Sequence, residues 1–372
     1  MAFEQARGLG AVGHDVRVET LDFTRFGSHP LLPGVEVNYQ PIRARAILRL
    51  APMTLQLRSA AASFRPDWIH CPQYRGYGLP VLATAHLARV PYSVYLHGTE
   101  LRTESKSTAR RAILSRVLHG AAFLATNSEN TRKITIELFP RLADRIFAIP
   151  PGVHAERFSK SSFPEASATV RKKVLSTIPS SIAALNPVLL VSVSRISRQK
   201  GIHMMIRAFA EIVKLNPTFP AVYAAFGSGP ATEEFRSLAQ SLGVGDRVVF
   251  PGPIPYEETP PIYHAADIYA QPSQPEGDFL ESFGISFLEA QASGLPCIGS
   301  EWGGVPEAVL RNESALLVPI GDTQALATAI QRLVRDPELR QTMGKKGLAH
   351  AGCTSWTAHI QMLEGHLTPS SQ

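Results

Sequence analysis

Short apolar runs alternate with stretches of helical period along the chain, and this alternation predicts a parallel α/β fold. The apolar runs of the first half predict strands, at Val16–Thr20, Val35–Tyr39, Trp68–His70, Tyr92–Leu96, Ala122–Thr126 and Ile146–Pro150. The stretches between and before them predict helices, at Ala2–Ala11, Ala44–Ser63, Ser105–Leu118 and Asn130–Leu138. This series ends at Pro150-Pro151-Gly152, and we interpret the polar stretch Ser159–Ser180 as the connection to a second domain.

The second half repeats the alternation and predicts a second unit of the same class. Its apolar runs predict strands, at Pro187–Ser194, Ala221–Phe226, Arg247–Phe250, Ile268–Gln271, Pro296–Gly299 and Ala315–Val318. Helices are predicted between and after them, at Ile202–Leu215, Ala231–Leu242, Glu257–Ala265, Gly284–Ser293, 323–334 and Trp356–Leu367. Two doubly wound units joined by a linker predict a ligand cleft at the carboxyl ends of their strands.

These elements divide the chain into an N-terminal domain at 1–155, a C-terminal domain at 156–350 and a last helix in 351–372 that crosses back to the first domain. A doubly wound domain should open with a strand and a glycine-rich turn, whereas this chain opens with a helix and Gly13-His14. We therefore expect the first strand of the N-terminal domain to be missing.

Composition narrows the class of protein. With 372 residues, 44% hydrophobic and 18% charged, the chain is long enough for about two globular domains. Its three cysteines (Cys71, Cys297 and Cys353) have the spacing of neither a zinc site nor a disulfide framework, which favours a reducing compartment. No apolar run approaches the ~18 residues of a membrane span, and the N-terminus lacks a signal pattern. These features predict a cytoplasmic protein.

The net charge of +6 is concentrated in the first half: residues 1–155 carry 19 Lys and Arg against 11 Asp and Glu. A nucleic acid, a membrane surface or a phosphorylated substrate would suit this charge. Nucleic acid is the least expected, because no aromatic residues interleave with the basic ones. One predicted helix contains five basic residues, Arg102, Lys106, Arg110, Arg111 and Arg116. It is typical either of a helix lying on an anionic membrane or of a domain helix with a solvated face.

Two glutamates eight residues apart mark the strongest candidate site, in Glu281-Ser-Phe-Gly-Ile-Ser-Phe-Leu-Glu289. If the segment is largely helical, they lie ~12 Å apart along the axis, at about 1.5 Å per residue. That distance is too long for an acid/base pair on one bond, but it suits two hydroxyl-bearing rings on either side of a diphosphate. Gly284 suits a helix start that approaches phosphate closely. A solvated helix with scattered glutamates is the alternative.

Basic residues and glycine turns surround this candidate site. Arg195 and Lys200 lie in a strand-to-helix turn and could together bind a pyrophosphate, although a solvated basic loop has about equal weight. His97 follows the strand Tyr92–Leu96, so it is expected either to face the cleft or to be a structural histidine. Further turns that follow predicted strands contain Gly229, Pro253-Ile254 and Gly303–Glu307, and each is a weak signal alone.

The candidate residues fall within longer motifs, which include Gln271-Pro-Ser-Gln-Pro-Glu-Gly-Asp, Glu281-Ser-Phe-Gly-Ile, Glu289-Ala, Gly294-Leu-Pro and Gly303-Gly-Val-Pro-Glu307. Together with Arg195, Lys200-Gly201 and His97-Gly98, they resemble the motifs of glycosyltransferase family 4. An interdomain motif of that family resembles Pro150, Gly152, Val153 and Phe158, and its tail resembles Gly321-Asp322, Asp336-Pro337 and Trp356. The resemblance implies retaining enzymes of GT-B fold, with two Rossmann-like domains that face a cleft.

The resemblance also implies a role for each matching residue. Arg195 and Lys200 would neutralise the donor diphosphate, Glu281 would bind hydroxyls of the donor sugar, and His97 would contact that sugar. Glu289 would hold the ribose. The remaining residues expected around the nucleotide sugar are Gly229, Pro253, Ile254, Phe283, Gly284 and Ile285. A UDP- or GDP-sugar would be the donor substrate, and neither a cofactor nor a metal is implied. Since the family opens with a strand and a Gly-Gly turn that contact the donor, we expect weak or absent activity from this chain.

Three functions are weighed. The leading hypothesis is transfer of a hexose to a glycolipid or polysaccharide acceptor in cell-envelope or exopolysaccharide biosynthesis, with peripheral contact to an anionic membrane. A second is a non-catalytic sugar-nucleotide-binding remnant, caused by the missing strand, but the retention of Glu281, Arg195, Lys200 and His97 argues against long decay. A third, an epimerase or phosphorylase on the same architecture, lacks a supporting lysine motif.

Overall fold

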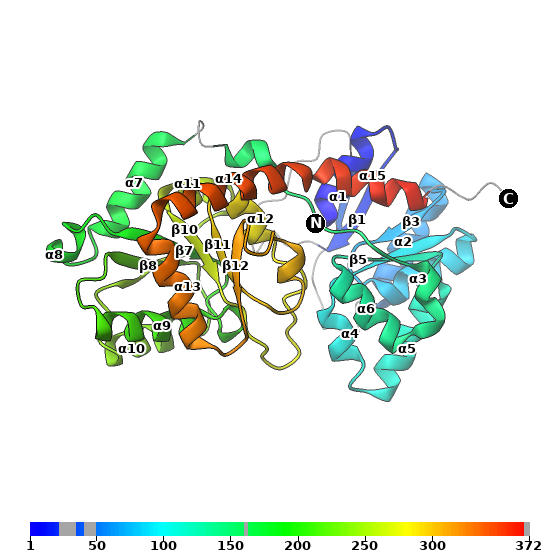
Figure 1. Ribbon diagram of the computed structural model, residues 1–372. Helices are drawn as coiled ribbons and strands as arrows, with labels where there is room; N and C mark the ends of the chain where they lie inside the picture. The colour runs from blue at the N-terminus through cyan, green and yellow to red at the C-terminus, as the bar shows by residue number, and fades with distance from the viewer. Residues whose placement is uncertain (22–34, 41–49, 160–162, 368–372) are drawn as a thin grey trace. The chain divides into compact units, whose positions relative to one another are not determined.

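A computed structural model describes residues 1–21, 35–40, 50–159 and 163–367 (Figure 1). The chain forms two compact units, Met1–Pro151 with Trp356–Gln372, and Gly152–Ser355. All paired strands within each unit's sheets are parallel, so both units are α/β structures, as the alternation predicted. None of the helices in the described ranges is long and apolar enough to cross a membrane.

The second unit contains a six-stranded sheet in the order β12-β11-β10-β7-β8-β9. Its strands are β7 (Val188–Val193), β8 (Ala221–Phe226), β9 (Val248–Gly252), β10 (Ile268–Gln271), β11 (Cys297–Ser300) and β12 (Ala315–Val318). From β7 the chain builds the sheet outward through β8 and β9, then returns to the other side of β7 with β10. The order therefore reverses between β7 and β10, and in such sheets ligands bind beyond the carboxyl ends of the strands at this reversal.

Alternating residues of β7 send apolar side chains to the two faces of this sheet. Leu190 packs into a core with one set of helices, α9 (Ile202–Leu215), α10 (Thr232–Ser241) and α13 (Thr323–Arg335). Leu189 and Val191 pack into a second core with another set, α7 (Pro164–Leu175), α8 (Ser180–Ala183), α11 (Pro260–Ala265) and α12 (Ile285–Ala292). Fully burying a leucine stabilises the fold by about 1.5–3 kcal/mol, so both faces contribute.

The first unit contains a four-stranded sheet of β3 (Ile69–Cys71), β4 (Tyr92–Leu96), β5 (Phe123–Thr126) and β6 (Ile146–Ala148), and a separate pair of β1 (Arg17–Leu21) and β2 (Glu36–Gln40). Its helices are α1 (Ala2–Ala11), α2 (Leu50–Phe64), α3 (Gly78–Ala88), α4 (Thr99–Glu104), α5 (Thr108–Gly120), α6 (Glu129–Leu138) and α15 (Trp356–Leu367). Helices α1 and α15 pack together, and Gln5 Nε2 lies 3.1 Å from His359 Nε2.

Several predicted elements are confirmed to the residue, including the helices at Ala2–Ala11 and Ile202–Leu215 and the strands at Tyr92–Leu96 and Ala221–Phe226. The helix predicted at Ala44–Ser63 is α2 in its described part, since 44–49 lie outside the described residues. The helix predicted at Ser105–Leu118 is α5, whereas α4, which precedes it and carries Arg102, was not predicted.

Two expectations were wrong or incomplete in the second unit. The stretch 163–180 is not an open connection, because it contains α7, whose Val174 is buried in the core beside Ile178. Helix α14 (Pro337–Cys353) was missed, because it packs against α12 through small residues. A Cβ on its Gly344 would lie 2.2 Å from the carbonyl oxygen of Gly294. A helix that buries glycines gives no strong apolar period.

The basic helix α5 is an ordinary domain helix. Its apolar residues Leu114, Val117 and Leu118 are fully buried in the core of the first unit. Arg110, Arg111 and Arg116 lie on the exposed side. These three apolar residues therefore serve the fold, while Ile113, which is 39% exposed, lies outside the core, as the three arginines do.

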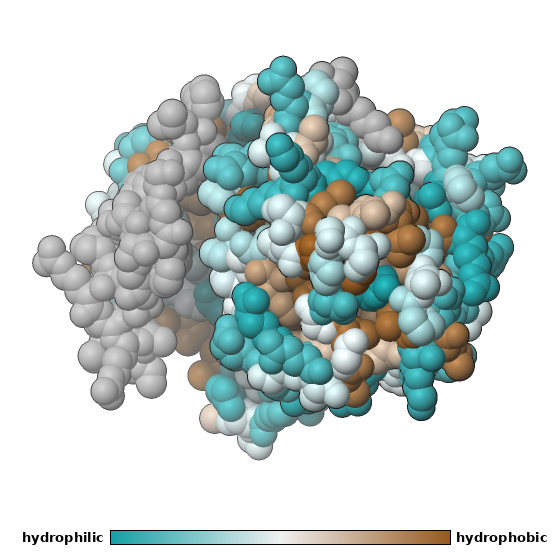
Figure 2. All heavy atoms as spheres, turned by 90° about the vertical axis from the view of Figure 1, so that its left-hand side faces the viewer, coloured by the Kyte–Doolittle hydropathy of each residue, from teal (hydrophilic) through white to brown (hydrophobic). Residues whose placement is uncertain are grey.

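Three leucines are exposed where the chain approaches the amino ends of strands in the second unit. Leu185, Leu215 and Leu242 are 42%, 80% and 38% exposed, and they precede β7, β8 and β9. Figure 2 views the surface from the side that carries α7, α8 and α10, and shows apolar side chains in its middle, surrounded by polar ones. These leucines lie at the amino ends of the strands, the opposite edge of the sheet from the candidate site.

Candidate donor site

Two loops meet at the reversal of strand order in the second unit. One follows β7 and leads to α9 through the 3₁₀ turn η6 (Arg198–Lys200), and the other follows β10 and leads to α12. Gly201 has a φ of +71°, and a Cβ at this position would lie 1.8 Å from the carbonyl oxygen of Pro272. The two backbones can therefore approach this closely only because residue 201 is a glycine.

The Glu281 carboxylate lies where these loops meet. Lys200 Nζ donates to Glu281 Oε2 at 2.7 Å, and Ser273 Oγ and Gln271 Nε2 donate to the same oxygen at 2.8 Å and 3.2 Å. Glu281 is only 7% exposed, so its charge would be costly without these partners. The predicted proximity of Lys200 and Glu281 is therefore present, across 81 residues of sequence. None of the three bonds uses Oε1.

The Gly303-Gly304 turn fixes the backbone of Glu281. Gly304 N donates to Glu281 O at 2.8 Å, and a Cβ on Gly303, whose φ is +64°, would lie 2.2 Å from that oxygen. This turn leads into the 3₁₀ turn η8 (Val305–Glu307). A motif that the sequence left as a cleft lining or a plain turn is thus a support for the candidate carboxylate.

The segment that joins the two glutamates is not helical throughout. Helix α12 begins at Ile285, and Gly284 precedes it with a φ of +99°. The ~12 Å separation assumed a helix from Glu281 onward, and this condition is not met. Phe283 is 3% exposed and packs in the core. Gly284 and Ile285 lie at the start of α12, where backbone N–H groups lack helical acceptors.

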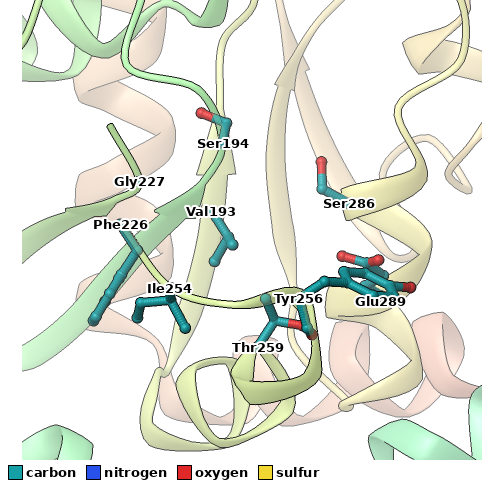
Figure 3. A pocket seen from close by; sticks show the side chains of 9 residues that line it. All are labelled: Val193, Ser194, Phe226, Gly227, Ile254, Tyr256, Thr259, Ser286 and Glu289. Atoms are coloured by element: carbon teal, nitrogen blue, oxygen red, sulfur yellow. The ribbon is translucent and has the colours of Figure 1, made fainter. Parts of the chain in front are cut away.

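Glu289 lies in a different environment, at a pocket of about 340 Å³. The residues that line this pocket are Val193, Ser194, Phe226, Gly227, Ile254, Tyr256, Thr259, Ser286 and Glu289. Figure 3 shows the Glu289 carboxylate beside Tyr256, with Phe226 and Ile254 on the other side of the pocket. The pocket thus combines apolar walls with a carboxylate at one end, which suits a ligand with a flat ring and hydroxyl groups.

Two tyrosines hold the Glu289 carboxylate. Tyr263 OH donates to Glu289 Oε2 at 2.7 Å, and the Tyr256 side chain is a second hydrogen-bond partner. Burial raises the pKa of Glu289, while the hydrogen bonds from both tyrosines and the charge of Arg157 act in the opposite direction. Neither tyrosine was singled out from the sequence, although the turn at Pro253-Ile254 in the same stretch between β9 and β10 was.

Arg195 lies beside the same pocket. It follows Ser194, which lines the pocket, and its side chain is exposed. Within the described part of the chain, its guanidinium has no hydrogen-bond or ion-pair partner, whereas Arg198 in the same loop pairs with Glu234. A cation without a protein partner, near the part-buried Lys200–Glu281 pair, is available to an anionic ligand.

The other residues expected around the nucleotide differ in their placement. Ile254 and Glu289 line the pocket, but its lining does not include Gly229, Pro253, Phe283, Gly284 or Ile285. Gly229 has another role, because a Cβ there would lie 2.1 Å from the carbonyl oxygen of Ile196. It therefore allows the turn after β8 to pack against the loop that carries Arg195.

Two aromatic residues near Lys200 were also missed. Lys200 Nζ lies 5.3 Å from the centre of the Phe279 ring, and this ring lies 6.1 Å from that of Trp302. A cation at this distance from an aromatic face is attracted to it, so Phe279 helps to orient the lysine. Phe279 lies between the motif that ends at Asp278 and the one that begins at Glu281, and belongs to neither.

His97 lies in the first unit, directly after β4. Its Nε2 lies 2.9 Å from the carbonyl oxygen of Pro72, so that nitrogen must carry the hydrogen. Its ring also packs on Tyr95, with the ring centres 5.2 Å apart. The structure thus gives His97 local partners that fix its ring, and the expected contact with the donor sugar stays a prediction. Among the described residues, no three His, Cys, Asp or Glu side chains group as metal ligands do.

Comparisons with known proteins bear on this architecture. The family "Glycosyltransferase Family 4" matches residues 1–157, and "Glycosyl transferases group 1" matches residues 177–350. A D-inositol 3-phosphate glycosyltransferase of Acidothermus cellulolyticus is 31% identical over 97% of this chain and 82% of that protein. A protein of the same name from Corynebacterium glutamicum is 32% identical over 77% of this chain, and this match spans 65% of its length.

Solved structures show the same fold. HepE from Anabaena, solved with UDP and glucose, aligns with a TM-score of 0.79 and 20% identity over 100% of this chain and 95% of that chain. Sucrose-phosphate synthase from Thermosynechococcus elongatus aligns with a TM-score of 0.75 and 24% identity over 97% and 90%. Sequence motifs, the parallel sheets and these matches agree: the chain belongs to the family 4, group 1 glycosyltransferases and has the GT-B fold.

Proposed function

We propose that this protein is a retaining glycosyltransferase that transfers a hexose from a UDP- or GDP-linked sugar to a glycolipid or polysaccharide acceptor. The observation that carries the proposal is the part-buried Lys200–Glu281 pair at the strand-order reversal, in the unit whose pocket holds Glu289. A nucleotide sugar has a hydroxyl-bearing ring at each end of a diphosphate. Two separate carboxylates could each bind one ring, and the cations between or beside them could bind the diphosphate.

The pocket at Glu289 suits the nucleoside. Its walls include Val193, Phe226 and Ile254, which can pack on a base, and the carboxylate can accept hydrogen bonds from the two ribose hydroxyls. A carboxylate accepts through both oxygens only when it is ionised. The hydrogen bonds from Tyr263 and Tyr256 favour that form despite burial.

The charges suit a diphosphate leaving group. As the bond to the sugar breaks, negative charge develops on the nucleotide, and Arg195 and Lys200 would stabilise it. Glu281, held by Lys200 and Ser273, would accept hydrogen bonds from sugar hydroxyls. We propose that His97 contacts the same sugar and that acceptor attack occurs on the face the leaving group departs from, with two cations in place of a metal.

The names of relatives and the ligands of a solved structure support the donor class and leave the base open. HepE was solved with UDP and glucose, which favours a uridine nucleotide. A GDP-mannose-dependent phosphatidylinositol monomannoside mannosyltransferase of Mycolicibacterium smegmatis is 34% identical over 70% of this chain, which favours a guanosine nucleotide. Both nucleotides therefore belong in the test.

The acceptor proposal rests on charge and on relatives. Residues 1–155 carry a net charge of +8, and α5 presents three arginines outward. Relatives are named for inositol phosphate or phosphatidylinositol acceptors, which are anionic or lipid-linked. We propose an acceptor of this chemistry in cell-envelope biosynthesis, reached from the cytoplasmic side through electrostatic contact with the membrane.

Calorimetric titration of the protein with UDP, GDP, UDP-glucose and GDP-mannose tests the donor proposal. We expect saturable binding of one nucleotide and its sugar, weakened at least tenfold by Lys200→Ala. Lack of binding to all four would overturn the proposal. The donor that binds is then incubated with the protein and either a lipid extract or an inositol compound as acceptor. The anomeric configuration of the product is determined by NMR. An inverted product would contradict the retaining mechanism.

A further inference from the structure

Residues at the start of the second unit contact the tyrosines beside Glu289, and no role has yet been given to them. Pro150, Gly152, Val153 and Phe158 resemble an interdomain motif of the family. In the structure, residues 155–158 form the 3₁₀ turn η4 (Ala155–Phe158), the first element of the second unit. Its last two residues, Arg157 and Phe158, each contact one of the two tyrosines that hydrogen-bond Glu289.

Phe158 supports Tyr263. The Phe158 side chain is fully buried, and its ring packs edge-on against Tyr263 at 5.7 Å between ring centres. Tyr263 is itself fully buried and donates to Glu289 Oε2. This contact is part of the core and keeps one phenol in place by packing alone.

Arg157 supports Tyr256 in a different way. Its guanidinium carbon lies 4.2 Å from the centre of the Tyr256 ring, and its Nη2 donates to the Tyr256 carbonyl oxygen at 2.8 Å. One side chain therefore holds both the ring and the backbone of the same residue. Tyr256 needs such support, because it is 50% exposed and lies in the short turn η7 (Tyr256–Glu258), outside the core.

We propose that Arg157 is a positioning residue for nucleotide binding, which clamps Tyr256 beside the Glu289 carboxylate and so fixes the ribose-binding end of the pocket. The inference deepens the proposed function and rests on it. Arg157 does not line the pocket; it acts through Tyr256, which does. Its charge also favours the ionised carboxylate, in the same direction as the two phenols.

The alternative is that Arg157 only ties η4 to η7 and adds stability. Another arginine of the second unit makes the same two contacts with an aromatic residue that does not line the pocket. Arg236 lies 5.3 Å over the Phe250 ring and donates to the Phe250 carbonyl oxygen at 3.3 Å, and Phe250 is not a lining residue. Arg236→Met is therefore a matched control for Arg157→Met, since both substitutions remove a stacked guanidinium and keep an unbranched stem.

The experiment measures the Kd of UDP and GDP, the KM and kcat for the matching sugar nucleotide, and the Tm of each variant. Arg157→Met should weaken nucleotide binding and raise KM by about tenfold, with kcat changed less than about twofold, because ground-state and transition-state binding are lost together. Arg157→Lys keeps the charge without the planar stacking group, so its Kd should fall between those of the wild type and Arg157→Met. Arg236→Met should leave Kd unchanged.

A double-mutant cycle supplies a second arm. Tyr256→Phe removes the hydroxyl but keeps the ring, and should also weaken nucleotide binding. If Arg157 acts through Tyr256, the two substitutions are not independent. The double variant should then lose less binding free energy than the two single variants lose together. An unchanged Kd in Arg157→Met, with or without a lower Tm, would overturn the inference while the proposed function stands. Failure of the unsubstituted protein to bind either nucleotide would overturn both.

Discussion

The two units bury polar side chains beside their sheets in opposite ways. In the first unit, burial lowers the pKa of His70 to about 3 and that of His359 to about 4, so both rings are neutral. In the second unit, Glu281 and Glu289 are 7% and 6% exposed and accept hydrogen bonds, Glu281 from Lys200 and Glu289 from Tyr263. A neutral imidazole can be buried with a few local hydrogen bonds, as His359 is with Pro150 and Gln5.

A buried carboxylate is far more expensive, because an uncompensated charge loses its hydration. The second unit buries two carboxylates within nine residues. An ammonium group compensates the charge of Glu281, and two phenol groups donate hydrogen bonds to Glu289. A packing role would be filled as well by an apolar side chain. The difference therefore separates buried polar groups that serve the fold from those that serve a ligand, and substitutions can test it.

The largest effect is expected at Glu281. Glu281→Gln keeps the size of the side chain but leaves Lys200 without its counterion, and we expect kcat/KM to fall by about 1,000-fold. Glu233→Gln, at an 85% exposed side chain of the same unit, is the control and should change activity less than about twofold. If Glu281→Gln retains more than a tenth of the activity, the carboxylate belongs to the fold rather than to the site.

The next effect is expected at Arg195. Arg195→Ala should lower kcat/KM by about 100-fold, since its guanidinium would stabilise the diphosphate. Arg198 lies three residues further along the same loop but pairs with Glu234, so Arg198→Ala should cost about threefold or less. Steady-state kinetics at two salt concentrations measure both. Equal losses in the two variants would show that the loop needs positive charge in general.

A smaller, more specific effect is expected at Glu289. Glu289→Gln should weaken nucleotide binding by about tenfold, because one acceptor for a ribose hydroxyl is lost. Burial raises the pKa of this carboxyl, so ionisation opposes folding above that pKa. Glu289→Gln should therefore raise the Tm at pH 8 while it lowers affinity. A lower Tm at pH 8 would mean that the charge, with its two tyrosines, stabilises the fold.

The last prediction concerns stability rather than activity, at the histidines of the first unit. Their pKa values in the folded state lie below the usual 6.5, so below pH 6.5 the unfolded chain binds protons that the folded unit excludes. Stability should fall by roughly 2 kcal/mol per histidine between pH 7.5 and pH 5. Denaturant unfolding in a Trp302→Phe background follows this unit through Trp68 and Trp356. His359→Gln should reduce the pH dependence, and the exposed-site variant His86→Gln should not.

The sequence predicted the framework of this site well, because its signals are local. Periodicity located most strands, and Lys200 and Glu281 follow strands that a doubly wound sheet places side by side. The tyrosines at 256 and 263 could not be found this way. They reach Glu289 from η7 and α11, through side-chain packing that neither spacing nor composition encodes.

The errors have a common physical cause. The ~12 Å separation of Glu281 and Glu289 assumed one continuous helix, but Gly284 takes a positive φ and α12 starts only after it. The stretch after Ser159 looked like a connection because its polar residues outnumber the apolar ones that α7 buries. In both cases tertiary contacts, rather than local preference, decided the conformation.

Helix α15 has a consequence for the order of folding during synthesis. Residues 1–151 leave the ribosome first, yet their core is completed by Ile360 and Leu363, and Gln5 and Pro150 find their partner in His359. Residues 152–355 are continuous, so the second unit has its whole core available earlier. Domains usually fold in the order in which they are made. Here the unit that is translated first is the one whose core is completed last.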